Sequence, residues 1–428
     1  MSTRVSTLPG GLRVVTDRMD HVQTVSLGLW AGAGARSERK GQQGLSHLLE
    51  HMAFKGTRNR TARQIAEEIE AVGGDLNAAT SLENTAYYAR VLGEDVCLGL
   101  DILGDIVQRP SFDKAELLKE RAVLLQEIAA SLDSPEDTAF DLILEAAYPD
   151  QPFGRPILGT PESVGALGPK ELEAYRREHY SPGNIILAAV GAVDHDGIVK
   201  LAGDRLSELP HSTPAPPQPA RYAGTVRHAR RPVEQTHLIL ACEALPASHA
   251  DYYVAQAFSA VLGGGMSSRL FQEARENRGL CYSIYSFCWG FSDTGIFGIY
   301  AATGDASQGE LMQVVAGEME RMASKPALES ELSRVRAQMK VGLLMNLESS
   351  SARAEQLGRQ LAVHGRAVPM SEMVARVEAV DAESVRRFGE RLLTRSRPSF
   401  VAVGPTATAE TTERLISMLP HGAAAEAE

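Results

Sequence analysis

The chain repeats one pattern of strands and helices, and this repeat constrains its fold more than any other feature. The run QTVSLGLWAGAG from Gln23 aligns with QTHLILACEAL from Gln235, at an offset of 212. The run AELLKERAVLLQEIAASL from Ala115 aligns with SELSRVRAQMKVGLLMNL from Ser330, at an offset of 215. The first pair alternates apolar and polar residues, as half-buried strands do, and the second has the apolar steps of amphipathic helices. Such internal similarity indicates a duplication.

A proline-rich segment separates the two copies. The stretch LPHSTPAPPQPARY, residues 209–222, holds five prolines and cannot continue a helix or a central strand. We therefore expect a domain over 1–209, a stiff linker over 210–222 and a homologous domain over 223–420. The last residues, 421–428, are expected to be disordered. Each domain is predicted to be α+β, with an antiparallel sheet backed by helices.

The composition indicates which class of protein this is and which partners it is expected to lack. Hydrophobic residues make up 44% of the chain and charged residues 23%, as in globular domains. The formal net charge of −11 argues against a nucleic-acid partner. No apolar run reaches the roughly 18 residues of a membrane span, and the N-terminus lacks an apolar signal segment. The four cysteines form no CxxC pair, so we expect reduced thiols and a cytoplasmic location.

The stretch GLSHLLEHMAFKGT, residues 44–57, places ionisable groups within an apolar run. On a helix, His47 and His51 lie one turn apart on the same face, which suits two imidazoles on one metal ion. Zinc is the usual ion for two histidines and a carboxylate. Glu50 could reach a metal-bound water without being a ligand, so it is the candidate general base. The spacing H-x-x-E-H is that of the inverzincin motif.

The alternative is a core helix in which the three polar residues are incidental. The repeat supplies an internal comparison, because at offset 212 they become Ser259, Leu262 and Gly263. The second copy keeps the helical pattern without the histidines and the glutamate. The fold therefore does not require them, which favours a chemical role.

A catalytic zinc needs a third protein ligand, and a later helix offers two glutamates. Glu120 and Glu127 are seven residues apart and so lie on one face. Glu127 sits on a mostly apolar stretch, where an unpaired carboxylate is costly, and its equivalent in the second copy is Gly342. We take Glu127 as the third ligand and Glu120 as an acid that supports a ligand without binding the metal itself. The alternative is a pair of solvated helix glutamates.

Together these residues resemble the M16 family of zinc peptidases, which includes mitochondrial processing peptidase. In that family a glutamate follows H-x-x-E-H on a later helix, with a second acid seven residues before it. Here Glu127 follows His51 by 76 positions, and Glu120 occupies the second place. The run HLLEHMAFKGT looks most like the processing-peptidase (M16B) branch. The resemblance covers nearly the whole chain and implies one zinc ion per chain and two domains that form half of a clamshell.

The resemblance also assigns residues that bind substrate. In the family an edge strand beside the zinc pairs with the peptide, which implies that Asn77, Ala78 and Ala79 bind its backbone. The alternative is an ordinary edge strand. An arginine and a tyrosine in the other half of the clamshell correspond to Arg275 and Tyr282. The resemblance implies that Tyr282 stabilises the oxyanion and that Arg275 holds the substrate backbone.

Processing peptidases recognise an arginine near the cut through two acids, which correspond here to Asp137 and Asp141. These lie four residues apart and could hold one guanidinium. They could equally be the acidic first turn of a helix with Ser134 as its N-cap. The acidic surplus of the first copy favours a basic ligand, although a solvated acidic surface explains it equally well.

The implied activity is that of a zinc endopeptidase that cuts peptides or unfolded segments beside basic residues. The run GGGMSSRLF, 263–271, resembles the glycine-rich loop of the processing peptidase's non-catalytic subunit, though it is shorter. The H-x-x-E-H motif and this glycine-rich loop lie in the same chain here. A homodimer could therefore supply every part of the active site, with Tyr282 coming from the partner chain. One alternative is a structural core subunit of the same fold without proteolysis. Another is a catalytic chain that needs a distinct, inactive partner.

Overall fold

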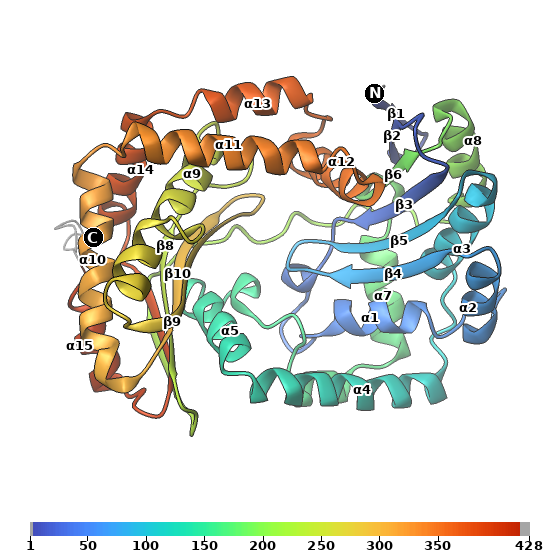
Figure 1. Cartoon of the computed structure of the whole chain (residues 1–428). Helices are drawn as coiled ribbons and strands as arrows, with labels where there is room; N and C mark the ends of the chain where they lie inside the picture. The colour runs from blue at the N-terminus through green and yellow to red at the C-terminus, as the bar shows by residue number, and fades with distance from the viewer. Residues whose placement is uncertain (1–2, 420–428) are drawn as a thin grey trace. The chain divides into compact units, whose positions relative to one another are not determined.

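The computed structural model describes residues 3–419, and the strands there form two sheets, one for each copy of the repeat (Figure 1). The first sheet has the order β1-β2-β6-β3-β5-β4. Neighbouring strands are antiparallel except β2 and β6, which are parallel. Its strands are β1 (Thr3–Thr7), β2 (Arg13–Arg18), β3 (Thr24–Ala31), β4 (Asp75–Thr80), β5 (Thr85–Leu92) and β6 (Ile185–Gly191).

The second sheet has the order β7-β11-β8-β10-β9 and again contains one parallel pair, β7 with β11. Its strands are β7 (Val226–Arg230), β8 (Thr236–Glu243), β9 (Cys281–Gly290), β10 (Gly295–Thr303) and β11 (Ser399–Gly404). The predicted α+β class, with two helix-backed and chiefly antiparallel sheets, is confirmed. The predicted disordered tail, 421–428, lies outside the described residues.

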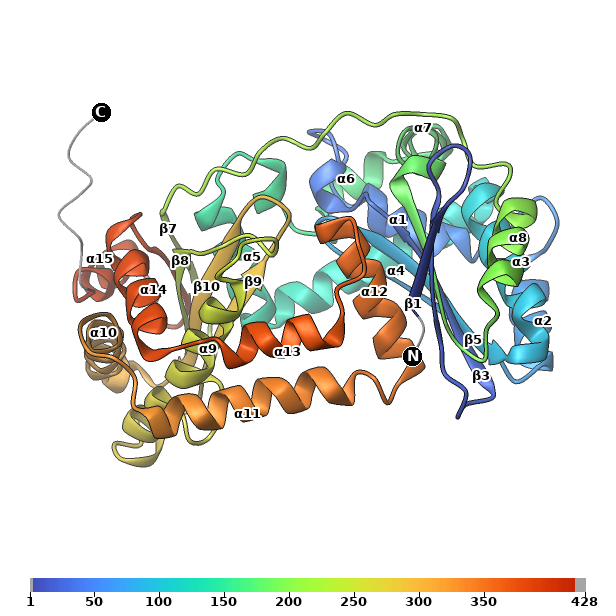
Figure 2. The same cartoon turned by 90° about the horizontal axis from the view of Figure 1, so that it is seen from above.

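Helices cover both faces of the first sheet, which explains why β6 is buried along its whole length. Ile185 and Leu187 belong to the core beneath one set of helices, whereas Ile186 and Ala188 belong to a core on the opposite face. Alternate residues of a strand point to opposite faces, so one apolar run serves both cores. The first set comprises α1 (Leu45–Ala53), α2 (Ala62–Ala71), α3 (Val96–Gln108), α4 (Lys114–Asp133), α6 (Pro161–Ala166), α7 (Pro169–His179) and α8 (His195–Arg205), with α2, α3 and α8 grouped at one flank (Figure 2).

The opposite face of the first sheet is covered by α12 (Ser350–His364), a helix from the second half of the sequence. Its Arg353 is buried and donates from Nε to Oδ2 of Asp17 on β2, at 2.8 Å. Ser26 on β3 lies 2.8 Å from Ser350 between the two hydroxyl oxygens. A buried, hydrogen-bonded ion pair of this kind fixes which helix packs here and in which register.

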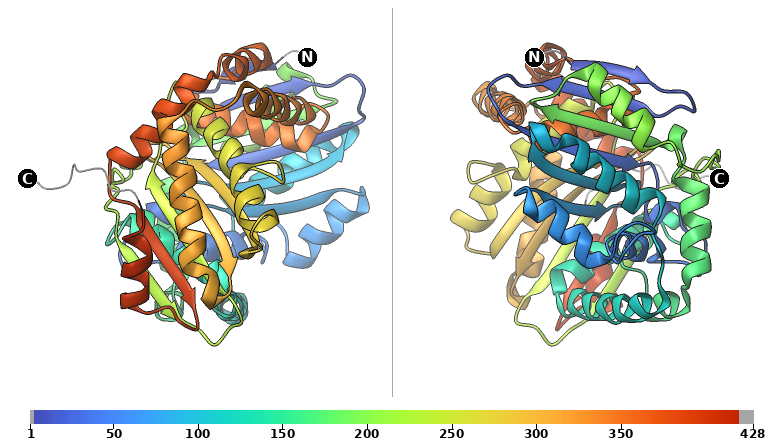
Figure 3. Two further views of the ribbon diagram at one scale, coloured as in Figure 1. Left: turned by 60° about the vertical axis from the view of Figure 1, so that its left-hand side comes forward. Right: turned by 90° about the vertical axis from the view of Figure 1, so that its right-hand side faces the viewer.

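The second sheet has the reciprocal arrangement. Its main core lies under α9 (Tyr252–Gly263), α10 (Gln308–Ser324), α14 (Ala382–Thr394) and α15 (Ala409–Ile416), and Figure 3 shows α10 beside α14. Two further helices, α11 (Glu329–Met345) and α13 (Met370–Glu378), add Leu332 and Met373 to the buried residues. The opposite face is covered by α5 (Pro135–Ala147), a helix from the first half of the sequence. Phe140 of α5 stacks on Tyr300 of β10, with ring centroids 5.8 Å apart.

The chain therefore packs as two compact units that each borrow a helix from the other half of the sequence. One unit comprises the chain up to Ala129 with Arg155–Gln218 and Leu344–Pro369. The other comprises Ala130–Gly154, Pro219–Leu343 and the chain from Met370. The domain boundaries predicted at 209 and 223 follow the repeat in the sequence, and they stay a prediction. The predicted half-clamshell arrangement of the two domains also stays a prediction. Within residues 3–419, no helix is both long and apolar enough to cross a membrane.

Candidate metal centre

The helix that carries the two histidines begins at a buried carboxylate. Glu38 accepts hydrogen bonds from the backbone N–H groups of Gly44, at 3.0 Å, and Ser46, at 2.8 Å, and from the Ser46 hydroxyl. Gly44 has φ +86° and lies against the carbonyl oxygen of Leu158, so a larger residue would not fit there. Burial raises the pKa of Glu38 to about 7, against the opposing effect of these hydrogen bonds. Sequence analysis missed Glu38, which fixes the start of α1.

His47, His51 and Glu127 converge at one point, and no other such group of three His, Cys, Asp or Glu side chains occurs within residues 3–419. Their ligand atoms all lie within 4.8 Å of one another. Nε2 of His47 lies 3.7 Å from one oxygen of Glu127, and Nε2 of His51 lies 3.8 Å from the other. These gaps are too long for hydrogen bonds. They are close to the separation of about 3.3 Å expected between donors on one tetrahedral zinc ion.

The protonation of the histidines suits a metal. The pKa of His47 is lowered to about 4 by burial and by the neighbouring His51, so the ring is neutral at physiological pH. Nδ1 of His51 lies 3.0 Å from Oε2 of Glu120, an acceptor, so that nitrogen carries the proton and Nε2 keeps its lone pair. Two imidazoles and one carboxylate are a usual zinc ligand set, and the three residues therefore fit the ion.

Glu120 is buried behind His51 and is also held by a cation, Lys55. Lys55 Nζ lies 2.8 Å from Oε1 of Glu120, while His51 contacts Oε2. Burial alone would raise the pKa of Glu120, but the hydrogen bonds from Lys55 and His51 outweigh it, and the pKa is lowered. Lys55 lies in the turn that follows α1, four residues after His51, and no pattern in the sequence identifies its contact with Glu120.

Glu50 lies beside the convergent ligands without being one of them. Its carboxylate oxygen Oε2 accepts a hydrogen bond of 2.5 Å from the hydroxyl of Thr80, at the end of β4. Burial raises the pKa of Glu50, and the hydrogen bond from Thr80 only partly offsets this effect. A carboxylate with a raised pKa next to a metal centre is suited to accept a proton from water.

The sequence resembles known metallopeptidases over most of its length. A family profile described as Insulinase (Peptidase family M16) matches residues 13–161, and one described as Peptidase M16 inactive domain matches residues 166–339. A zinc protease of Streptomyces coelicolor is 36% identical over 413 residues, which cover 94% of this chain and 90% of the relative. The chain belongs to peptidase family M16. His47, His51 and Glu127 all lie in the region that matches the Insulinase profile.

Within family M16 the chain is similar to the processing peptidases. The beta subunit of mouse mitochondrial-processing peptidase is 35% identical over 419 residues, which cover 94% of this chain and 84% of that subunit. The processing-peptidase-like branch expected from the motif is thereby confirmed. A protease from Helicobacter pylori has the same fold, with a TM-score of 0.87 at 21% identity over 94% of this chain and 99% of that one.

The second copy of the repeat lacks not only the ligands but also the space for them. Ser259 and Gly263 of α9 are buried, and a side chain at Gly263 would collide with the backbone of Ser286 on β9. Ser259 instead lies 3.1 Å from the hydroxyl of Ser286. Direct packing of helix on strand therefore replaces the metal centre, consistent with the description of this part of the family as an inactive domain.

The predicted peptide-binding residues lie on β4, an outer strand of the first sheet. Asn77 and Ala79 are exposed, whereas Ala78 faces the core. The N–H of Ala78 donates to the side-chain oxygen of Asn77 at 2.8 Å. An incoming peptide strand that uses this donor would have to displace the Asn77 side chain.

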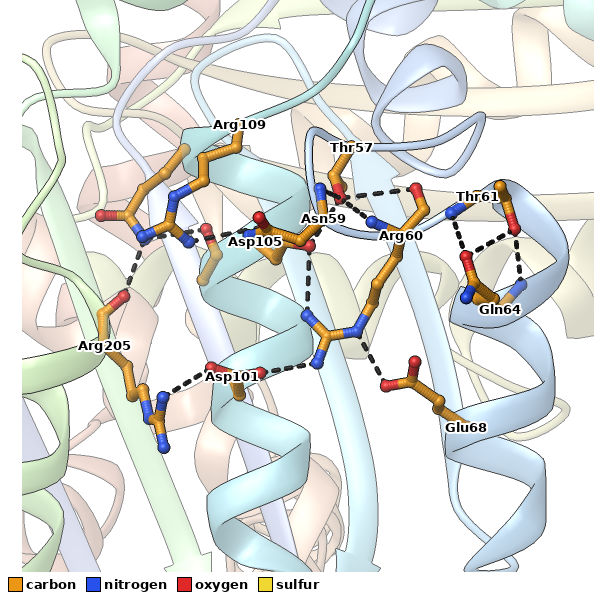
Figure 4. Close-up of polar contacts among 12 residues, drawn as sticks. Thr57, Asn59, Arg60, Thr61, Gln64, Glu68, Asp101, Asp105, Arg109 and Arg205 are labelled. Carbon is orange, nitrogen blue, oxygen red and sulfur yellow. Dashed lines mark hydrogen bonds and ion pairs between the residues drawn. The ribbon is translucent and has the colours of Figure 1, made fainter.

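The loop that follows α1 is anchored by a buried acid (Figure 4). Asp105 of α3 accepts hydrogen bonds from the Thr57 hydroxyl at 2.6 Å and from the Asn59 amide at 2.7 Å. Arg60 bonds Asp105 at 3.1 Å and also bonds Asp101 and Glu68. This network fixes the chain immediately after Lys55 and so supports the contact between Lys55 and Glu120.

The remaining predicted site residues belong to the second unit. Arg275 lies over the rings of Phe271 and Tyr282, with its guanidinium carbon 4.7 and 5.2 Å from the ring centroids, and Tyr282 is 75% exposed. Asp137 and Asp141 lie one turn apart on α5 and are both exposed. The pKa of Asp141 is raised to about 6 by desolvation among surrounding protein atoms and by the charge of Asp137.

The N-terminus of α5 has the cap that sequence analysis proposed as an alternative for the two aspartates. Ser134 Oγ accepts from the backbone N–H of Asp137 at 3.2 Å. This cap and a role in binding a guanidinium are compatible, because the cap uses the backbone of Asp137 and leaves its carboxylate free.

Proposed function

We propose that the chain is a zinc-dependent endopeptidase. The observation that carries this proposal is the convergence of His47, His51 and Glu127 with Glu50 at their side. A zinc ion on these ligands would supply Lewis-acid polarisation of a water molecule and of the peptide carbonyl. Glu50 would accept a proton from the water that attacks the carbonyl carbon and would pass it to the amine that leaves.

The protein's own residues would bind and orient the substrate. An extended peptide adds to the free edge of β4 at Asn77, Ala78 and Ala79, which places one carbonyl beside Glu50. Arg275 and Tyr282 of a second copy would hold the peptide backbone and stabilise the developing oxyanion. A homodimer is therefore part of the proposal. An extended peptide or an unfolded segment fits such a site, because a folded chain does not present a free strand.

A preference for basic residues near the cut is supported by Asp137 and Asp141. Two carboxylates one helical turn apart can accept the hydrogen bonds of one guanidinium. The raised pKa of Asp141 indicates that the pair lacks a compensating cation and would gain from binding one.

Replacement of Glu50 tests the proposal. Glu50→Gln removes the proton acceptor but leaves the three ligands, so the variant should keep its zinc and lose peptide cleavage. A Glu50→Gln variant that cleaves at the wild-type rate would contradict the mechanism. A wild-type chain that binds zinc without cleaving any peptide would favour a structural subunit. Cleavage that needs an added, different subunit would favour a heterodimer.

A further inference from the structure

Thr80 connects the edge strand to the candidate base. It is the last residue of β4 and shares the inward face of that strand with Leu76 and Ala78, both more buried than Asn77 and Ala79. Its hydroxyl donates to Oε2 of Glu50 at 2.5 Å, across 30 residues of sequence. At this length the bond is in the range of short hydrogen bonds from a hydroxyl to a carboxylate.

The bond fixes the carboxylate in one orientation. A glutamate carboxylate turns easily about its last bond, since that torsion has broad minima. The Thr80 hydroxyl holds Oε2, and the backbone N–H of Thr80 also bonds the carboxylate, so the group has little freedom to turn. Thr80 is itself rigid, because its branched side chain has few rotamers and its backbone pairs with Thr85 of β5.

We propose that Thr80 is a positioning residue through which the strand that binds the peptide also orients the general base. This inference rests on the proposed endopeptidase function. Thr80 is adjacent to Ala79, the last of the three residues proposed to bind the peptide, so docking of a peptide and orientation of Glu50 depend on one strand. A peptide that pairs fully with β4 holds Thr80 in place and thereby holds Glu50.

A purely structural role would have different consequences. If Thr80 only satisfied the Glu50 carboxylate in the resting protein, its loss would lower stability but leave turnover of the folded enzyme unchanged. If it positions the base, its loss lowers kcat and leaves KM and zinc content unchanged, because neither the ligands nor the strand edge is altered.

The test uses the full-length protein with Thr80→Val, Thr80→Ser and the control Thr24→Val, an exposed threonine on β3. We expect Thr80→Val to lower kcat about 10- to 100-fold, the effect of a misplaced base, with KM and zinc content unchanged. Thr80→Ser keeps the hydroxyl and should restore most of kcat, and the control should match the wild type. A kcat for Thr80→Val equal to that of the wild type, or a serine variant as impaired as the valine variant, would overturn the proposal.

A second readout does not depend on activity and separates this proposal from the proposed function. In the zinc-free protein, Thr80→Val and Glu50→Leu should shift the urea midpoint non-additively when combined, because each removes the bond between the Thr80 hydroxyl and the Glu50 carboxylate. Additive shifts would mean that the two side chains do not interact and would overturn the inference. Absence of cleavage by the wild type would instead contradict the proposed function and leave this contact testable by the urea measurement.

Discussion

Nδ1 of His51 and Oε2 of Glu120 lie 3.0 Å apart, and this contact decides which nitrogen of His51 faces the other ligands. An ionised carboxylate behind a histidine holds the proton on Nδ1 and leaves Nε2 free for a metal. His47 has no equivalent support, because its buried Nδ1 has no hydrogen-bond partner among the residues that the structure describes. The two histidines are therefore not equivalent.

The contact leads to a prediction for zinc affinity. Glu120→Gln removes the negative charge behind His51 and should weaken zinc binding about 10- to 100-fold. Competition with a chromophoric chelator measures the dissociation constant. Glu116→Gln is the matched control, since Glu116 lies on the same helix and bonds the exposed Lys119. Equal affinity in the wild type and Glu120→Gln would contradict the role of Glu120.

Lys55 should act through Glu120. Lys55→Met keeps an apolar stem of similar length but removes the cation bonded to Glu120. The pKa of Glu120 should then rise, so zinc binding should be lost at a higher pH in the variant than in the wild type. Zinc affinity measured between about pH 5 and about pH 8 would reveal this shift. Identical pH profiles would mean that Lys55 has no effect on the centre.

Glu38 should make the stability of the first unit depend on pH. Its folded-state pKa is raised from 4.5 to about 7, so the folded state binds the proton more tightly than the unfolded state does. Glu38 therefore contributes about 3 kcal/mol to the free energy of unfolding below pH 4.5, and this contribution is lost as the pH rises to about 7.

Denaturant unfolding of the wild type and Glu38→Gln across this range measures the effect. The free energy of unfolding of the wild type, relative to that of Glu38→Gln, should fall as the pH rises. A relative free energy that increases with pH would mean that the hydrogen bonds from Gly44 and Ser46 outweigh the cost of burial.

Asn77 should compete with the substrate for the edge of β4. Asn77→Ala releases the N–H of Ala78 from the side chain that occupies it, and so should lower KM for extended peptides about 2- to 10-fold, the worth of one hydrogen bond. Steady-state kinetics with Asp75→Asn as the control, another exposed residue of β4, measures this change. A higher KM for Asn77→Ala would show instead that the Asn77 amide binds the peptide.

The composite site can be tested by mixing two inactive chains. A dimer of one Glu50→Gln chain and one Tyr282→Phe chain has one intact site if Tyr282 acts on the partner's metal centre. Random exchange makes half of the dimers mixed, so roughly a quarter of the wild-type activity should return. If Tyr282 acts within its own chain, no site is intact and no activity returns.

Some of these features could be predicted from the sequence and others could not. The spacing of His47 and His51 identifies two ligands, because helix geometry converts a four-residue step into a shared face. The residues alone left Glu127 with the alternative of a solvated helix glutamate, and the resemblance decided between them, since the spacing of 76 residues follows from the fold and not from local geometry. The contacts of Glu38, Lys55 and Thr80 have no sequence pattern, because they depend on how separate elements pack.

The sequence also did not predict that α5 and α12 each pack on the sheet formed by the other half of the chain. The apolar pattern of a helix predicts which side is buried but not which sheet buries it. The buried pair of Arg353 and Asp17, 336 residues apart, joins α12 to the first sheet together with the apolar contacts of Leu357 and Leu361. Repeats in the sequence therefore predicted two similar sheets, although not the reciprocal covering of their opposite faces.

Removal and return of zinc, followed by mapping of peptide products, tests the central claim most directly. The pure wild-type chain would be stripped with a chelator, reloaded with zinc and given a library of unstructured peptides at each stage. We predict that cleavage disappears on stripping and returns with about one zinc ion per chain, the occupancy of a single three-ligand centre. Cleavage that persists in the zinc-free protein, or a fully loaded protein that cuts no peptide, would contradict the account.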